Sequence, residues 1–151
     1  MFRKALLPAL TYLLCGAGLV GQAWAAGGPS VDANGVVTIH PGEKVAIKFA
    51  SESDISHPVL VSDASGPSTM SFKLEQLDGA GLMLMIENHL GITVKYDATI
   101  VVNTPDGERS AHTSSCPVLA GLMGTESWMD PIVELKLSGF RKADPDQRVC
   151  D

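Results

Sequence analysis

Apolar and polar side chains alternate along several short segments of the chain. In Lys44–Ala50, the apolar residues Val45, Ile47 and Phe49 are separated by lysine and alanine side chains. Met70–Glu75 repeats the pattern, with every second side chain apolar. Because successive side chains of a β-strand point to opposite faces, a period of two is typical of a strand with one buried face. Both segments are therefore predicted to be half-buried strands.

Further strands are predicted where short apolar runs are bounded by turn-forming residues. Glycine, proline, aspartate and asparagine mark the boundaries, as in Asn34-Gly35. The additional strand segments are Val36–Ile39, Pro58–Ser62, Leu82–Ile86, Ile92–Val102 and Val133–Ser138. No segment keeps the period of 3.6 residues that a surface helix would show. About seven short antiparallel strands predict an all-β fold, a single immunoglobulin-like β-sandwich, with a closed barrel as the alternative.

One segment, Ser114–Asp130, does not follow this pattern and is too apolar for an ordinary surface loop. A helical turn that begins near Pro117 would place its leucine and methionine side chains on one face. The segment is interpreted as a hydrophobic crossover that plugs the core, because monomers rarely expose large apolar patches. The alternative is a partner surface, formed by Leu119, Leu122, Met123 and Trp128.

The first 25 residues have the three parts of a secretory signal peptide. Arg3 and Lys4 supply a basic start, and Ala5–Val20 is an uncharged stretch. Ala23-Trp24-Ala25 is a small-residue cleavage site. An uncleaved anchor would need roughly 20 apolar residues, so cleavage is favoured. Lipidation at Cys15 is disfavoured by the bulky leucine that precedes it.

These features predict the domain organisation and the location of the protein. Residues 1–25 are expected to be removed, so that the mature chain starts near Ala26. Residues 26–34 are predicted to be a flexible segment, and residues 35–151 to be the β-sandwich domain. We expect a periplasmic or secreted protein with no stable membrane insertion after cleavage.

The charge of the mature chain limits the classes of partner. The whole sequence has 11 basic and 17 acidic residues, and loss of Arg3 and Lys4 leaves nine against seventeen, a net charge of −8. An acidic surface repels nucleic acid and anionic lipid. Neither partner is expected, whereas an envelope protein remains a candidate partner.

Two cysteines, Cys116 and Cys150, remain after removal of the signal peptide. An even number of cysteines in an exported protein predicts a disulfide. The alternative is that the thiolates bind a metal, but their spacing is not that of a Cys-x-x-Cys site. The predicted bridge would connect the extreme C-terminus to the apolar crossover.

The sequence offers weak candidates for catalysis. Ser110, His112, Ser114 and Ser115 lie close together, with Asp106 nearby. Nucleophilic catalysis needs a base that is held by a third group, and sequence proximity does not supply that geometry. There is no Gly-x-Ser-x-Gly motif. A hydrolase is therefore the disfavoured alternative, and the chain is predicted not to be an enzyme.

Copper is the most specific cofactor that the sequence suggests. Met83 and Met85 would share one face of a strand, with His89 just past its end. Thioether and imidazole groups suit copper. The simpler interpretation is that the methionines pack on a hydrophobic sheet face. The favoured function is thus non-catalytic binding or accessory work in the cell envelope, with copper binding as the alternative.

Overall fold

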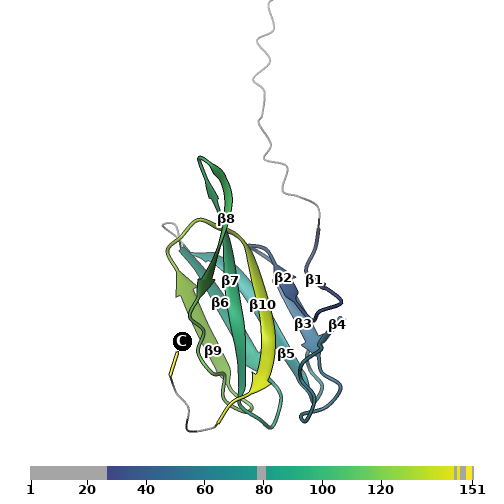
Figure 1. Cartoon of the computed structure of the whole chain (residues 1–151). Coiled ribbons are helices and arrows are strands. Elements are labelled where there is room, and N and C mark those ends of the chain that lie inside the picture. The colour runs from purple at the N-terminus through teal and green to yellow at the C-terminus, as the bar shows by residue number, and fades with distance from the viewer. Residues whose placement is uncertain (1–26, 78–80, 145, 147–148, 151) are drawn as a thin grey trace, which may run out of the picture.

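The computed structural model describes residues 27–77, 81–144, 146, 149 and 150. These residues form two five-stranded antiparallel sheets and no helix. The first sheet has the order β1 (Ser30–Val31), β2 (Val37–Ile39), β10 (Ile132–Lys142), β7 (Val94–Thr104) and β8 (Gly107–Thr113). The second has the order β4 (Val59–Val61), β3 (Lys44–Lys48), β5 (Thr69–Leu77), β6 (Gly81–Asn88) and β9 (Met123–Trp128). Figure 1 shows the two sheets as layers, consistent with the predicted β-sandwich.

The predicted signal peptide lies outside the described residues. Among the residues that are described, no helix is long and apolar enough to cross a membrane. Within the segment predicted to be flexible, Ser30 and Val31 pair with β2.

The alternating segments form strands whose predicted inward residues are buried, although Ala46 and Ser71 at outward positions are buried as well. On β5, Met70, Phe72 and Leu74 are buried, and Lys73 is exposed. Val45 and Ile47 on β3 are buried in the same way. Val37, Leu135 and Leu137 provide the facing layer from the first sheet. Each sheet therefore contributes one apolar face, and removal of these faces from water drives their association.

Aromatic rings connect the two layers at the centre of the core. Phe72 lies on β5 of the second sheet, whereas Tyr96 and Phe140 lie on β7 and β10 of the first. The ring centroid of Phe72 is 6.0 Å from that of Tyr96 and 6.2 Å from that of Phe140. Phe49 contacts Phe140 edge-on at 5.6 Å. Such tilted pairs are favourable beyond the area that they bury.

The apolar crossover differs from its prediction. The expected helical turn near Pro117 is wrong, because residues 119–122 make a reverse turn in which the Leu122 N–H donates to the Leu119 carbonyl. The chain then enters β9, a strand that the pattern did not predict. The inward positions of β9 are occupied by Gly124, Glu126 and Trp128, so apolar alternation is absent. Register with β6 defines the strand instead.

The strand β8 was also missed by the sequence pattern. All of its residues except Thr113 are exposed, so neither face carries an apolar signal. It pairs with β7 in a hairpin that projects beyond the sandwich in Figure 1. At the hairpin turn Gly107 has a φ of 111°, a conformation that residues with a side chain rarely adopt.

Candidate binding surfaces and the buried cluster beside them

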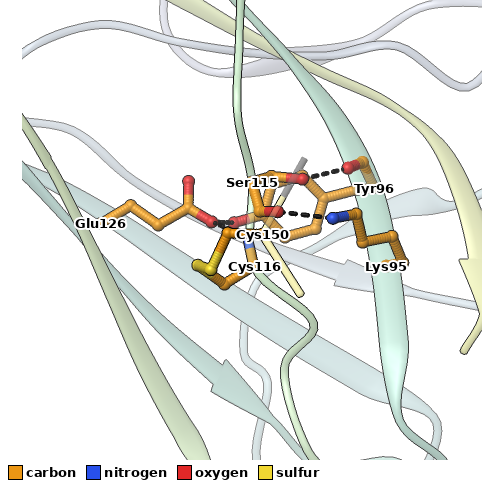
Figure 2. The surroundings of a disulfide bond; sticks show 6 residues. All are labelled: Lys95, Tyr96, Ser115, Cys116, Glu126 and Cys150. Atoms are coloured by element: carbon orange, nitrogen blue, oxygen red, sulfur yellow. Dashed lines mark hydrogen bonds between the residues drawn. A yellow bond between two sulfur atoms is a disulfide. The ribbon is translucent and has the colours of Figure 1, made fainter. Parts of the chain in front are cut away.

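The sulfur atoms of Cys116 and Cys150 lie 2.00 Å apart, which is disulfide distance. Their Cα atoms are separated by 4.2 Å. The pair connects the C-terminal tail to the chain between β8 and β9, and Figure 2 shows its surroundings. This geometry agrees with the pairing predicted from the number of cysteines and is compatible with an extracellular location.

A cluster of polar groups lies beside the disulfide. Glu126 Oε1 accepts hydrogen bonds from the Tyr96 hydroxyl at 2.9 Å and from the Cys116 backbone N–H at 2.8 Å. The Ser115 hydroxyl donates to the Tyr96 carbonyl, and the Lys95 ammonium donates to the Ser115 carbonyl. Figure 2 shows these side chains converging from β7, from β9 and from the segment that carries Cys116. The cluster thereby fixes the crossover against the first sheet.

Glu126 is the unusual member of this cluster. Its second carboxyl oxygen, Oε2, is buried and has no hydrogen-bond partner among the described residues. Burial raises the pKa of Glu126, although the Cys116 N–H, the Tyr96 hydroxyl and the Lys95 charge each oppose that shift. Burial, together with the Glu126 charge, also raises the pKa of Tyr96 well above its ordinary value. Burial therefore makes ionisation of Glu126 less favourable in the folded protein than in water.

We expect Glu126→Gln to change how stability depends on pH. Because the folded state raises the pKa of Glu126, folding binds its proton more tightly than the unfolded chain does. The stabilising contribution is present at low pH and is lost as pH rises through the folded-state pKa. Urea denaturation between about pH 4 and pH 7 should show wild-type stability falling relative to Glu126→Gln.

Tyr96→Phe provides the opposing variant for this experiment. It removes a donor that lowers the pKa of Glu126, so the decline with pH should become steeper than in the wild type. The comparison uses only the slope of unfolding free energy against pH. Absolute stabilities are not compared, because the new amide N–H of Glu126→Gln would itself lack a hydrogen-bond partner. Parallel curves for all three proteins would contradict the assignment.

The edge strand β9 exposes every second residue of the crossover. It pairs with β6 through Leu82↔Trp128 to Glu87↔Met123 without a register shift. The Asn88 N–H donates to the Leu122 carbonyl. Alternation along an antiparallel ladder then directs the backbone N–H and C=O groups of Met123, Thr125 and Ser127 away from β6. Within the described part of the chain, no other backbone pairs with them.

The residues predicted to contact a partner divide between core and surface. Leu122 is 52% exposed and Met123 is 67% exposed. Trp128 packs against the core, and its indole N–H donates to the Thr113 hydroxyl. Leu119 is partly buried. The crossover is thus a core element on one side, through Val118 and Trp128, and an exposed apolar surface on the other.

The structure places the candidate metal ligands on the outer face of the second sheet. Met83 and Met85 are half-buried there, because Leu82, Leu84 and Ile86 take the inner face. His89 follows β6, with its Nε2 atom 3.8 Å from Glu87 Oε2. Met83 and His89 are six residues apart along an extended chain, a span of about 20 Å. The part of the chain that is described holds no group of three or more His, Cys, Asp or Glu suited to a metal.

The residues considered for catalysis are not assembled into one site by the contacts of the structure. Ser110 and His112 lie on the exposed strand β8. His112 Nδ1 is 2.9 Å from the Ala98 carbonyl, which can only accept a hydrogen bond. Ser115 is buried and donates to the Tyr96 carbonyl instead.

A groove of about 560 Å³ opens between the loop at residues 52–56 and the end of β10. Ile55, Ile92 and Phe140 provide its apolar lining. Glu52 accepts from the Gly91 N–H, and the Asp54 carboxylate accepts from the Ser56 hydroxyl. The two carboxylates at the rim of the groove therefore already accept hydrogen bonds from groups of the protein.

Comparisons with known proteins give no relative. No protein-family model matches the chain, no curated protein matches it, and no solved structure matches it. The functional argument therefore depends on the described residues themselves. Sequence reasoning missed Lys95, Tyr96 and Glu126, because each is a polar or aromatic residue whose burial depends on strands that pair far along the chain.

Proposed function

We propose that this protein is an exported, immunoglobulin-like β-sandwich of the cell envelope that binds another protein and does not catalyse a reaction. The leader-like residues 1–25 and the pairing of Cys116 with Cys150 support export. The chain passes between the sheets from β2 to β3, from β6 to β7 and again on both sides of β9. These crossings support a sandwich of the immunoglobulin type. The single observation that carries the binding proposal is the outer edge of β9, with which no backbone among the described residues pairs.

Comparison of the sheet edges favours β9 as the binding element. Natural proteins protect edge strands by short length, charged side chains, prolines or bulges. β1 has 2 residues and β4 has 3, so both are short. β8 carries Glu108 and Arg109 on an exposed hairpin. β9 has 6 residues, no proline and no bulge, and its one charged residue, Glu126, points into the buried cluster.

The partner that suits such an edge is an extended segment of another protein. An added strand would bond to the outward backbone groups of Met123, Thr125 and Ser127. Apolar side chains at both ends of β9 would give this strand contact area, since Leu122 is exposed and Met129 is 76% exposed. Backbone bonding would supply affinity, and these side chains would supply selectivity.

Thr125→Pro tests this proposal by removing one outward N–H group. Proline is tolerated on the free side of an edge strand, and Thr125 makes no ladder bond to β6 in the register described above. A photoreactive residue at Ser127 should give a discrete cross-linked adduct in intact cells. Thr125→Pro should reduce the adduct yield at least about 5-fold, as expected for loss of a hydrogen bond and a steric block.

Thr125→Val is the matched control, because it keeps the N–H and the branched shape while losing only the hydroxyl. Its adduct yield should equal that of the wild type. A second control places the photoreactive residue at Ser110 on β8, where no adduct of the same size is expected. An adduct that persists with Thr125→Pro, or that forms equally from Ser110, would overturn the proposal. Circular dichroism of each variant checks that the sheet is intact.

A further inference from the structure

The methionines of the described chain differ in their exposure to solvent. Met70 is completely buried in the core, and Met83 and Met85 are half-buried on the outer face of β6. Met123 is 67% exposed, and Met129 is 76% exposed. These two stand at the ends of β9, one as its first residue and the other just after its last. Among the described residues, the most accessible thioethers therefore flank the strand that the proposed partner would bind.

An exposed thioether is open to oxidation by a peroxide. In this step the O–O bond of the peroxide breaks and an S–O bond forms at the sulfur lone pair. Methionine is oxidised to its sulfoxide, and hydrogen peroxide is reduced to water. Because the peroxide must reach the sulfur, burial protects Met70 and exposure leaves Met123 and Met129 open to attack. Side chains as exposed as these contribute little to the core, so their oxidation leaves the fold intact.

The position of Met123 brings the modified sulfur into the proposed contact. Met123 begins β9, and its backbone N–H and C=O groups point away from β6. An added strand would bond to these groups and place its own side chains beside the Met123 thioether. A sulfoxide is polar, and its removal from water costs free energy unless the partner donates a hydrogen bond to it. Oxidation therefore opposes binding at the same place where the thioether supplies apolar contact.

We infer that Met123 and Met129 are oxidation sites, and that a peroxide weakens the binding of a partner strand at β9 by converting them to sulfoxides. The effect on binding rests on the proposed function of β9, whereas the choice of sites depends only on exposure. Methionine sulfoxide reductases restore the thioether, so the loss of binding is reversible.

Peptide mapping by mass spectrometry tests the choice of sites on the purified protein. With limiting hydrogen peroxide, Met123 and Met129 should be oxidised at least about 3-fold faster than Met83 and Met85, and Met70 should react most slowly. In urea all these methionines should react at similar rates, because burial is the source of the difference. Equal rates in the folded protein would overturn the assignment of the sites.

Cross-linking from the photoreactive residue at Ser127 tests the effect on binding. Brief treatment of intact cells with hydrogen peroxide before irradiation should lower the adduct yield at least about 3-fold. The double variant Met123→Leu with Met129→Leu should keep its adduct after the same treatment, because leucine is apolar and has no sulfur. Met83→Leu with Met85→Leu is the matched control and should remain sensitive to peroxide.

A variant that needs no peroxide separates the modification from general damage to the cells. Met123→Gln places a polar group of similar length at the same position, so it should lower the adduct yield without treatment. Circular dichroism of this variant and of the oxidised protein checks that the sheets are intact.

The outcomes distinguish this inference from the proposed function of β9. An undiminished adduct from peroxide-treated wild type would overturn the inference and leave the binding function standing. An equal loss in the leucine double variant would also overturn it, because the oxidised group would then lie elsewhere. Absence of an adduct from untreated wild type would overturn the binding function and, with it, the effect of oxidation on binding.

Discussion

Replacing Phe72 with alanine is expected to lower the free energy of unfolding by about 3–5 kcal/mol. The side chain is completely buried, and its ring packs against those of Tyr96 and Phe140 in the opposite sheet. Alanine would leave a cavity where the two layers meet, and surrounding strands can collapse into it only partly. The loss should be large because it removes contacts that hold the sheets together.

Urea denaturation followed by tryptophan fluorescence measures this loss. Met129→Ala is a suitable control, since that side chain is 76% exposed and its removal should change stability by less than about 0.5 kcal/mol. Phe72→Leu should have an intermediate effect, because leucine fills part of the cavity. If Phe72→Ala cost less than about 1 kcal/mol, the aromatic contacts between the sheets would not be a main source of stability.

Removing the disulfide is the second change with a large expected effect. The bond joins residues separated by 34 positions, and a closed loop of that length restricts the unfolded chain by about 4 kcal/mol in the chain-entropy model. Cys116→Ala with Cys150→Ala should therefore lower stability by about 2–5 kcal/mol. The corresponding decrease in melting temperature is roughly 10–20 °C.

The double variant has a chemical control in the unchanged protein. Full-length protein carrying Cys15→Ser, denatured without reductant, should show no free thiol with Ellman's reagent. Reduction of that protein should bring its stability to the level of the double variant. Two reactive thiols per chain before reduction would contradict the bridge. Equal stability of the unreduced Cys15→Ser protein and the double alanine variant would contradict the structural role of the bridge. The hydrogen bond from the backbone N–H of residue 116 to the Glu126 carboxylate remains available in the alanine variant, because the donor is a backbone group.

The fold follows from the sequence wherever one face of a strand is apolar. Val45, Ile47 and Phe72 identified their strands because burial on one side imposes a period of two. β8 and β9 carry no such signal. β8 is exposed on both faces, and β9 places Gly124 and Glu126 toward the interior. Their strand structure depends on ladder bonds to neighbouring strands: β8 pairs with β7 in a hairpin, and β9 pairs with β6, which is far from it in the sequence.

The candidate sites show the same division. The sequence suggested Met83, Met85 and His89 as copper ligands, because the two methionines share a strand face and His89 follows just after that strand. It could not show that Met123 lies beside Glu87, which follows only from the pairing of β6 with β9. The sequence offered a core plug and a partner surface as alternatives for the whole apolar segment, whereas the structure buries Val118 and exposes Leu122 and Met123.

By itself, the sequence determined the all-β character, the main apolar strands and the likeness of residues 1–25 to a secretory signal peptide. It also identified the two cysteines that lie at bonding distance. These properties depend on the period of apolar positions, on composition and on the even number of cysteines, all of which can be counted along a chain. Only the tertiary structure decided which strands lie at the sheet edges and which carboxyl is buried with an oxygen that has no partner among the described residues. Those properties depend on register between distant strands, where a shift of one residue would exchange the two faces.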